Sequence, residues 1–84
     1  MFGSKEYSVS IKGRSGVLYT EGKRKVLFSA ELLAGPVDYV IYFKGEYFWE
    51  KPFENEVISD EDRIRIKQNM IAEFERKGLV VDWD

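Results

Sequence analysis

The sequence predicts an α+β fold: an antiparallel four-stranded meander, then one long helix packed on one face of the sheet, then a short final strand. Segments that alternate apolar and polar residues, separated by short glycine-containing turns, fill the first half of the chain. After position 59, apolar residues recur at the spacing of an α-helix. Because the 84 residues contain no linker-like or low-complexity stretch, we expect residues 1–84 to form a single domain.

Four strands are expected before the helix. The first shows the pattern most clearly, since Tyr7, Val9 and Ile11 alternate with polar residues. The expected strands cover residues 6–12, 17–21, 25–33 and 37–43. Their connections are short and carry glycine or proline, so an antiparallel meander is the simplest topology.

The fourth expected strand is apolar on both faces. Val40 and Tyr42 lie on one of them, together with Leu27 and either Leu18 or Tyr19 from neighbouring strands. One helix covers only one side of a sheet. We therefore expect this second face to be covered by the aromatic loop that follows, with a partly exposed patch, or to contact a second copy in a weak homodimer.

The helix should run from Asp60 to Lys77 and end at Gly78. Ser59 is a good N-cap, and Asp62 completes a pattern close to the capping box. The apolar stripe is predicted to contain Ile64, Ile66, Met70, Ile71 and Phe74. The opposite face is predicted to contain Arg65, Gln68, Asn69, Ala72, Glu75 and Arg76.

Lys67 projects near the middle of the apolar stripe. Its stem is expected to extend to the rim of the core, or its ammonium to pair with an acidic residue across a contact. After the helix, residues 79–83 alternate again and predict a short final strand with Leu79, Val81 and Trp83 on one side.

The composition excludes several chemistries. The chain has no cysteine and no histidine, which removes disulfides, thiolate metal sites and Cys-His or Ser-His nucleophiles. The close carboxylate pairs are Glu54 with Glu56 and Asp60 with Asp62, and helix capping already explains the second. We expect no enzymatic activity, no cofactor and no metal. No apolar run reaches membrane-spanning length, so a cytoplasmic location is expected.

Acidic and aromatic residues gather between positions 44 and 62. This stretch carries two Lys/Arg against seven Asp/Glu, a net charge of −5, whereas residues 1–43 carry +2 and residues 63–84 carry +1. Such a surface suits a basic protein partner and disfavours nucleic acid as a direct ligand. The candidate partner-binding residues are Glu46, Tyr47, Trp49, Glu50, Glu54 and Glu56.

Simpler interpretations stay open for these residues. The charged stretch could merely be solvated. Phe43, Phe48 and Phe53 are expected to close the core beneath the loop, whereas Tyr47 and Trp49, with their polar tips, fit either the core or an interface.

The tryptophan after the meander, Pro52, the acidic residues around it and the helix start at residues 58–62 resemble the immunity protein 74 family. Residues 8–12, 31–35 and 76–81 also resemble segments of that family, although Ala30 stands where its pattern has glycine. These are small cytoplasmic proteins of bacterial polymorphic-toxin systems. The resemblance implies neutralisation of a toxin by tight binding, usually of a nuclease-type domain, with no catalytic residues.

Three hypotheses follow from the sequence. The leading one is an immunity protein that inhibits a cognate, basic toxin domain through the acidic aromatic surface. The second is a homo-oligomeric structural or adaptor module that pairs through the second sheet face. The third is a small hydrolase that uses carboxylates and a metal ion.

Overall fold

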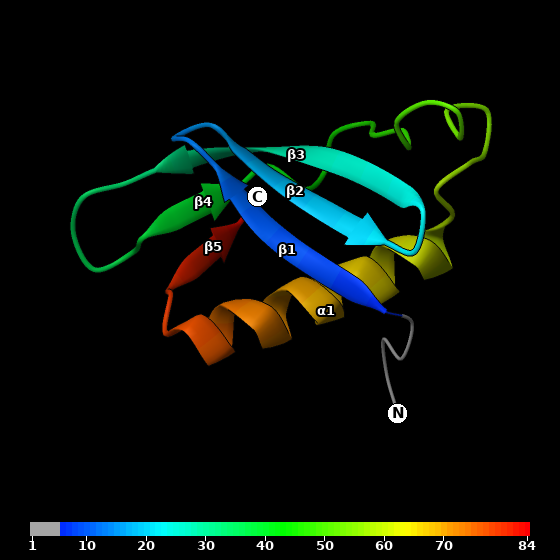
Figure 1. Ribbon diagram of the computed structural model, residues 1–84. Helices are drawn as coiled ribbons and strands as arrows, with labels where there is room; N and C mark the ends of the chain where they lie inside the picture. The colour runs from blue at the N-terminus through cyan, green and yellow to red at the C-terminus, as the bar shows by residue number, and fades with distance from the viewer. Residues whose placement is uncertain (1–5) are drawn as a thin grey trace.

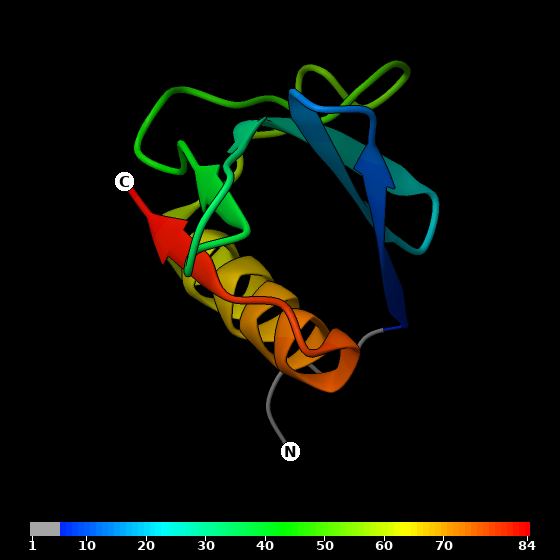
Figure 2. The same ribbon diagram turned by 90° about the vertical axis from the view of Figure 1, so that its left-hand side faces the viewer.

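The computed structural model describes residues 6–84 and has the predicted α+β fold (Figure 1). The elements are β1 (Tyr7–Lys12), β2 (Gly16–Glu21), β3 (Arg24–Leu32), β4 (Tyr39–Ile41), helix α1 (Asp60–Lys77) and β5 (Val81–Trp83). The strands form one sheet in the order β1-β2-β3-β4-β5, in which β1 to β4 pair antiparallel and β5 pairs parallel to β4. Helix α1 covers one face of this curved sheet (Figure 2).

The core lies between α1 and the inner face of the sheet, which we define as the face toward the helix. Strand register brings the inner residues into rows, for example Val9 opposite Tyr19 and Tyr19 opposite Val26. The buried apolar residues are Val9, Val17, Tyr19, Val26, Phe28, Ala30, Ile41, Phe43, Trp49, Ile66, Met70 and Phe74. The alternation that predicted the first three strands is thus the alternation between core and outer face.

The fourth strand is shorter than predicted. Only Tyr39–Ile41 pair with β3 as a strand, and just beyond them Phe43 O accepts from Arg63 Nη1 of α1. The chain still stays beside β3: Tyr42 N donates to Ser29 O and Glu50 N donates to Lys25 O, at 2.9 and 2.8 Å. The segment after β4 therefore covers the edge of β3 that β4 leaves open.

The outer face of the sheet is not covered by this segment. Leu27 on β3 remains 48% exposed, opposite the half-buried Leu18 of β2. Covering the β3 edge satisfies backbone hydrogen bonds, and that explains why the segment runs there and not over the apolar face.

Helix α1 has the predicted bounds and caps. Ser59 Oγ accepts from Asp62 N at 3.1 Å, and Asp62 Oδ2 accepts from Ser59 N at 3.0 Å. Gly78 ends the helix in the left-handed conformation, with φ of 73°, and its N–H donates to carbonyls of the last turn. The capping box is thus complete even with aspartate in place of the usual glutamate.

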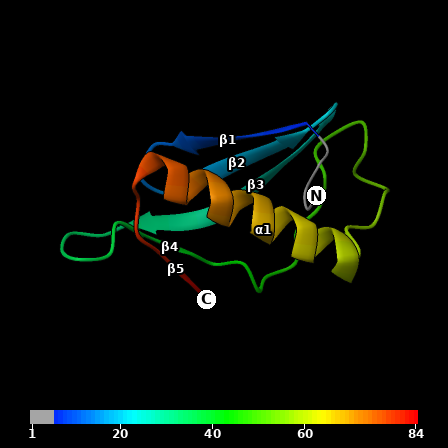
Figure 3. The ribbon, with the colours of Figure 1, turned by 90° about the horizontal axis from the view of Figure 1, so that it is seen from below.

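The predicted faces of α1 were partly wrong. Ile66, Met70 and Phe74 are buried as expected, but Ile64 is 59% exposed. Residues two apart on a helix lie on nearly opposite sides, so Ile64 could not share the buried face with Ile66. Asn69, which was predicted on the solvent side, is buried against the sheet. Figure 3 shows α1 lying across the strands.

The chain ends with a strand shorter than the predicted 79–83. β5 begins at Val81, and Val80 N donates to Asp38 Oδ2 at 2.8 Å just before it. Lys67 on α1 reaches this region: its Nζ lies 5.2 Å from the centroid of the Trp83 ring, a cation–π contact. Within residues 6–84 there is no helix long and apolar enough to span a bilayer.

Removing the N-cap tests the contribution of the capping box. We expect Ser59→Ala to lower the free energy of unfolding by about 1 kcal/mol, because the first turn loses one acceptor for its free N–H groups. Urea denaturation at neutral pH measures this. Ser10→Ala on β1 is the matched control, and an equal loss in both variants would contradict the capping role.

Candidate functional site

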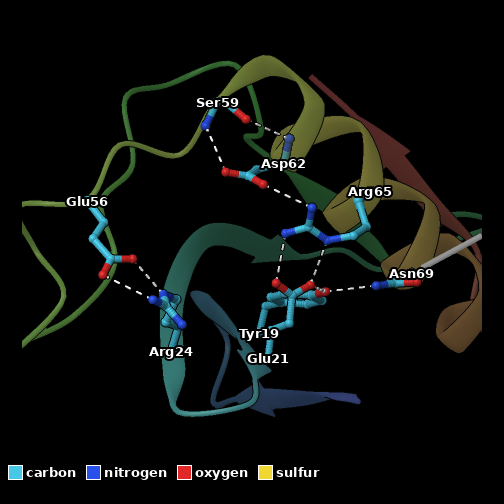
Figure 4. Close-up of polar contacts among 8 residues, drawn as sticks. All are labelled: Tyr19, Glu21, Arg24, Glu56, Ser59, Asp62, Arg65 and Asn69. Atoms are coloured by element: carbon cyan, nitrogen blue, oxygen red, sulfur yellow. Dashed lines mark hydrogen bonds and ion pairs between the residues drawn. The ribbon is translucent and has the colours of Figure 1, made fainter. Parts of the chain in front are cut away.

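The acidic loop (residues 42–59) connects β4 to α1 and is held by arginines at both ends. Near its C-terminal end, Arg24 of β3 donates from Nε and Nη2 to the two carboxylate oxygens of Glu56, at 2.7 and 3.0 Å (Figure 4). The Arg24 guanidinium also stacks over the Phe53 ring, 4.5 Å from its centroid. This bidentate contact fixes the far part of the loop to the β2–β3 hairpin.

The other end of the loop is fixed from the helix. Arg63 of α1 donates from Nη1 to Phe43 O at 2.9 Å and from Nη2 to Gly45 O. Tyr47 OH donates to Tyr42 O and accepts from Ser29 N at 3.2 Å. The loop thus has a defined conformation although it has no regular secondary structure.

The six candidate partner-binding residues all lie on this loop but differ in exposure. Trp49 is only 3% exposed and belongs to the core, and Tyr47 is half-buried with its ring 4.6 Å from that of Phe28. Glu46, Glu50 and Glu54 are exposed, and their side chains make no hydrogen bond or ion pair with any part of residues 6–84. Glu56 is exposed but neutralised by Arg24.

Two exposed apolar residues on the loop were not among the candidates. Phe48 is 63% exposed and Val57 is 81% exposed. The expectation that Phe48 closes the core was wrong. Burial alternates along this part of the loop, so that Tyr47 and Trp49 face inward while Phe48 faces outward. Three consecutive aromatic residues do not show this alternation in the sequence.

A groove of about 430 Å³, called here the loop groove, runs along this part of the loop. It is lined by Glu46, Tyr47, Phe48, Glu54, Asn55, Glu56, Val57, Ile58 and Arg63. It therefore combines apolar side chains with carboxylates from three of the candidate positions. The charge of such a surface is complementary to that of a basic protein partner.

A second hollow of about 490 Å³, the polar cleft, lies beside it between the β2–β3 hairpin and the start of α1. Its lining consists of Glu6, Glu21, Gly22, Arg24, Trp49, Glu56, Val57, Asp62 and Arg65. Glu56 and Val57 line both hollows, so the two form adjoining parts of one surface.

The polar cleft contains a network of polar contacts around one buried carboxylate, that of Glu21, which the sequence did not reveal. Glu21 is 5% exposed and accepts from Arg65 Nε and Nη2 at 2.9 and 2.8 Å (Figure 4). Arg65 Nη1 donates to Asp62 Oδ1 at 2.9 Å. Tyr19 OH donates to Glu21 Oε2 at 2.7 Å and accepts from Asn69 Nδ2 at 2.8 Å. The network connects β2 to α1.

The charge states follow from these contacts. Burial raises the pKa of the Tyr19 hydroxyl, which stays protonated and donates to Glu21. The hydrogen bonds to Glu21 raise the pKa of Arg65, which stays charged. Each of these groups binds another group of the protein, and none is a nucleophile beside a base. Residues 6–84 contain no group of three Asp or Glu side chains placed to hold a metal ion.

Asp62 should make stability depend on pH. Burial acts to raise the pKa of its carboxyl, but hydrogen bonds from Ser59 and Arg65 outweigh it, so the folded pKa lies below the ordinary value of 3.8. Its contribution is thus present above about pH 4 and is lost as pH falls through the lower folded pKa. We expect the difference in melting temperature between the wild type and Asp62→Asn to shrink between pH 5 and pH 2. A constant difference would contradict this.

One comparison with known proteins gives a match: the family model described as immunity protein 74 covers residues 8–84. No curated protein and no solved structure matches the chain. The matched range begins at the second residue of β1 and contains the other four strands, helix α1 and the whole acidic loop.

Proposed function

This chain belongs to the immunity protein 74 family, and on that premise we propose that it neutralises a bacterial toxin by binding the toxin domain through the acidic loop. The observation that carries the proposal is the set of three exposed carboxylates, Glu46, Glu50 and Glu54, on a loop fixed at both ends. A fixed loop loses little conformational entropy when it binds, which favours the tight binding that neutralisation needs.

The charge of the loop region indicates the kind of toxin. Residues 44–62 carry a net charge of −5, which complements a surface rich in lysine and arginine. A nuclease domain needs such a surface, because its substrate is a phosphate backbone. We propose a nuclease-type toxin, which the chain inhibits in the cytoplasm by occupying or covering that basic surface.

The roles of the six candidate residues follow from their placement. Glu46, Glu50 and Glu54 would meet the toxin directly. Tyr47 and Trp49 would support the loop from beneath, and Glu56 would hold it to Arg24. Direct contact by the Trp49 ring is not part of this proposal, because the ring is buried in the core.

Co-expression tests the function. The toxin domain encoded immediately upstream should arrest growth when expressed alone, and this chain should restore growth and co-purify with it. Failure of both rescue and co-purification would refute the proposal. Rescue without co-purification would point to a different mode of protection.

A second candidate is a homo-oligomeric structural or adaptor module, favoured by the half-exposed Leu27 on the uncovered outer face. Leu18 and Val40 lie on the same face, and Tyr42 OH donates to Glu31 there at 2.7 Å. Light scattering at high concentration tests it. A dimer that Leu27→Lys dissociates would support this candidate, and a monomer throughout would remove it.

A further inference from the structure

We propose that the loop groove receives a cationic side chain of the toxin, an arginine or a lysine, between Phe48 and Val57. This inference rests on the proposed function and specifies its contact. The acidic loop alone predicts attraction to a basic surface. The groove adds a place where one cationic residue of that surface would be bound.

The carboxylates that line the groove differ in whether a cation of the chain already binds them. Glu56 is neutralised by the bidentate contact with Arg24, and Arg63 is engaged by two backbone carbonyls. Glu46 and Glu54 line the same groove, and neither side chain has a hydrogen bond or ion pair within the described residues. Within residues 6–84 the groove therefore presents two carboxylates without an ion pair against the single guanidinium of Arg63, and this remaining net charge of −1 favours a positively charged occupant.

The apolar residues of the groove indicate which kind of side chain it would bind. Phe48 and Val57 are 63% and 81% exposed, and both line the groove. A guanidinium or an ammonium carries its charge on an apolar stem, and such a stem packs well on exposed apolar side chains. The Phe48 ring also offers its face to a cation. An amphipathic cationic side chain fits both features, whereas a purely aliphatic one would leave the carboxylates unmatched.

Arg24 shows within this chain how such a contact is made. Its guanidinium stacks on the Phe53 ring while it binds the carboxylate of Glu56. Phe48 with Glu46 and Glu54 offers the same pair of chemical groups, an aromatic ring and carboxylates, without an internal partner. In the polar cleft, by contrast, Arg65 and Arg24 already bind three of the four carboxylates, those of Glu21, Asp62 and Glu56, and only Glu6 has no ion pair among residues 6–84.

The test measures the affinity of the purified upstream-encoded toxin domain for variants of the full chain. We expect Phe48→Ala to weaken binding about tenfold or more, and Val57→Ala to weaken it severalfold. Val80→Ala, which truncates a valine that is 51% exposed outside the groove, is the control and should change affinity less than twofold.

A second set of measurements identifies the occupant. Each arginine and lysine on the toxin surface is replaced by methionine, and each variant is measured against wild type and against the double variant Glu46→Gln/Glu54→Gln. At least one toxin residue should lose about tenfold affinity for wild type and much less for the double variant, since coupled partners are non-additive.

The outcomes separate the two proposals. If wild type binds the toxin but Phe48→Ala and Val57→Ala bind within twofold of it, the groove assignment is wrong and the proposed function stands. The assignment also fails if every toxin variant behaves additively with the double variant. If wild type does not bind the toxin domain at all, both proposals fail.

Discussion

Replacing Glu46, Glu50 and Glu54 together with lysine is expected to slow association with the toxin domain by about tenfold to a hundredfold at low salt. These carboxylates are exposed and unpaired within residues 6–84, so they contribute mainly to the field that attracts the partner. The effect should fall steeply as ionic strength rises toward 0.5 M, because salt screens exposed charges. Stopped-flow or surface plasmon measurements of the association rate check this.

The control changes the net charge equally outside the loop groove. Glu75, Asp82 and Asp84 are exposed, at the end of α1 and on and just after β5, and none of them lines the groove. Reversing these three with lysine should alter the association rate much less. Equal effects of the two triple variants would show that total charge, and not the acidic loop, governs association.

The second large effect concerns stability. Arg65→Met should lower the free energy of unfolding by about 3–5 kcal/mol, because it removes the two charged hydrogen bonds that Arg65 donates to the buried carboxylate of Glu21. Glu21 is 5% exposed, and Arg65 contributes both of its short bidentate contacts. Urea denaturation followed by tryptophan fluorescence measures the loss, since Trp49 lines the same cleft.

A double variant separates charge burial from loss of packing. Glu21→Gln in the Arg65→Met background removes the buried charge and should recover a large part of the lost stability. Arg76→Met is the matched control: that guanidinium pairs with Glu73 on the exposed side of α1, and its removal should barely move the midpoint. No recovery in the double variant would mean that packing, and not an unpaired charge, explains the loss.

Much of the fold could be predicted because its signals are local. The alternation of apolar and polar residues predicted β1 to β3. The capping residues Ser59 and Gly78 predicted the bounds of α1. The limits of β4 could not be predicted, because the segment after Ile41 is as apolar as a strand, and where the regular pairing ends Phe43 O binds Arg63 of α1, which is a tertiary contact. The parallel pairing of β5 depends on where α1 returns the chain, which is a tertiary property.

The acidic loop could be singled out from the sequence, but the contacts of its side chains could not. The acidic and aromatic composition identified the loop, but composition does not reveal which carboxylates are already neutralised. The Arg24–Glu56 contact joins residues 32 positions apart and the Arg65–Glu21 contact joins residues 44 apart. One signal was available: Glu21 continues the inner-face alternation of Val17 and Tyr19, so a buried acid that needs a cation could have been expected.

Amide hydrogen exchange of the chain, alone and with the toxin domain bound, tests the central claim most directly. Tyr47, Phe48, Glu54 and Val57 lie on the proposed contact surface, and we expect their amides to exchange more slowly in the complex. Amides of β1 and of the last turn of α1 should be unchanged. Added protection confined to the outer sheet face around Leu27, with none in residues 46–58, would contradict the claim that the acidic loop binds the toxin.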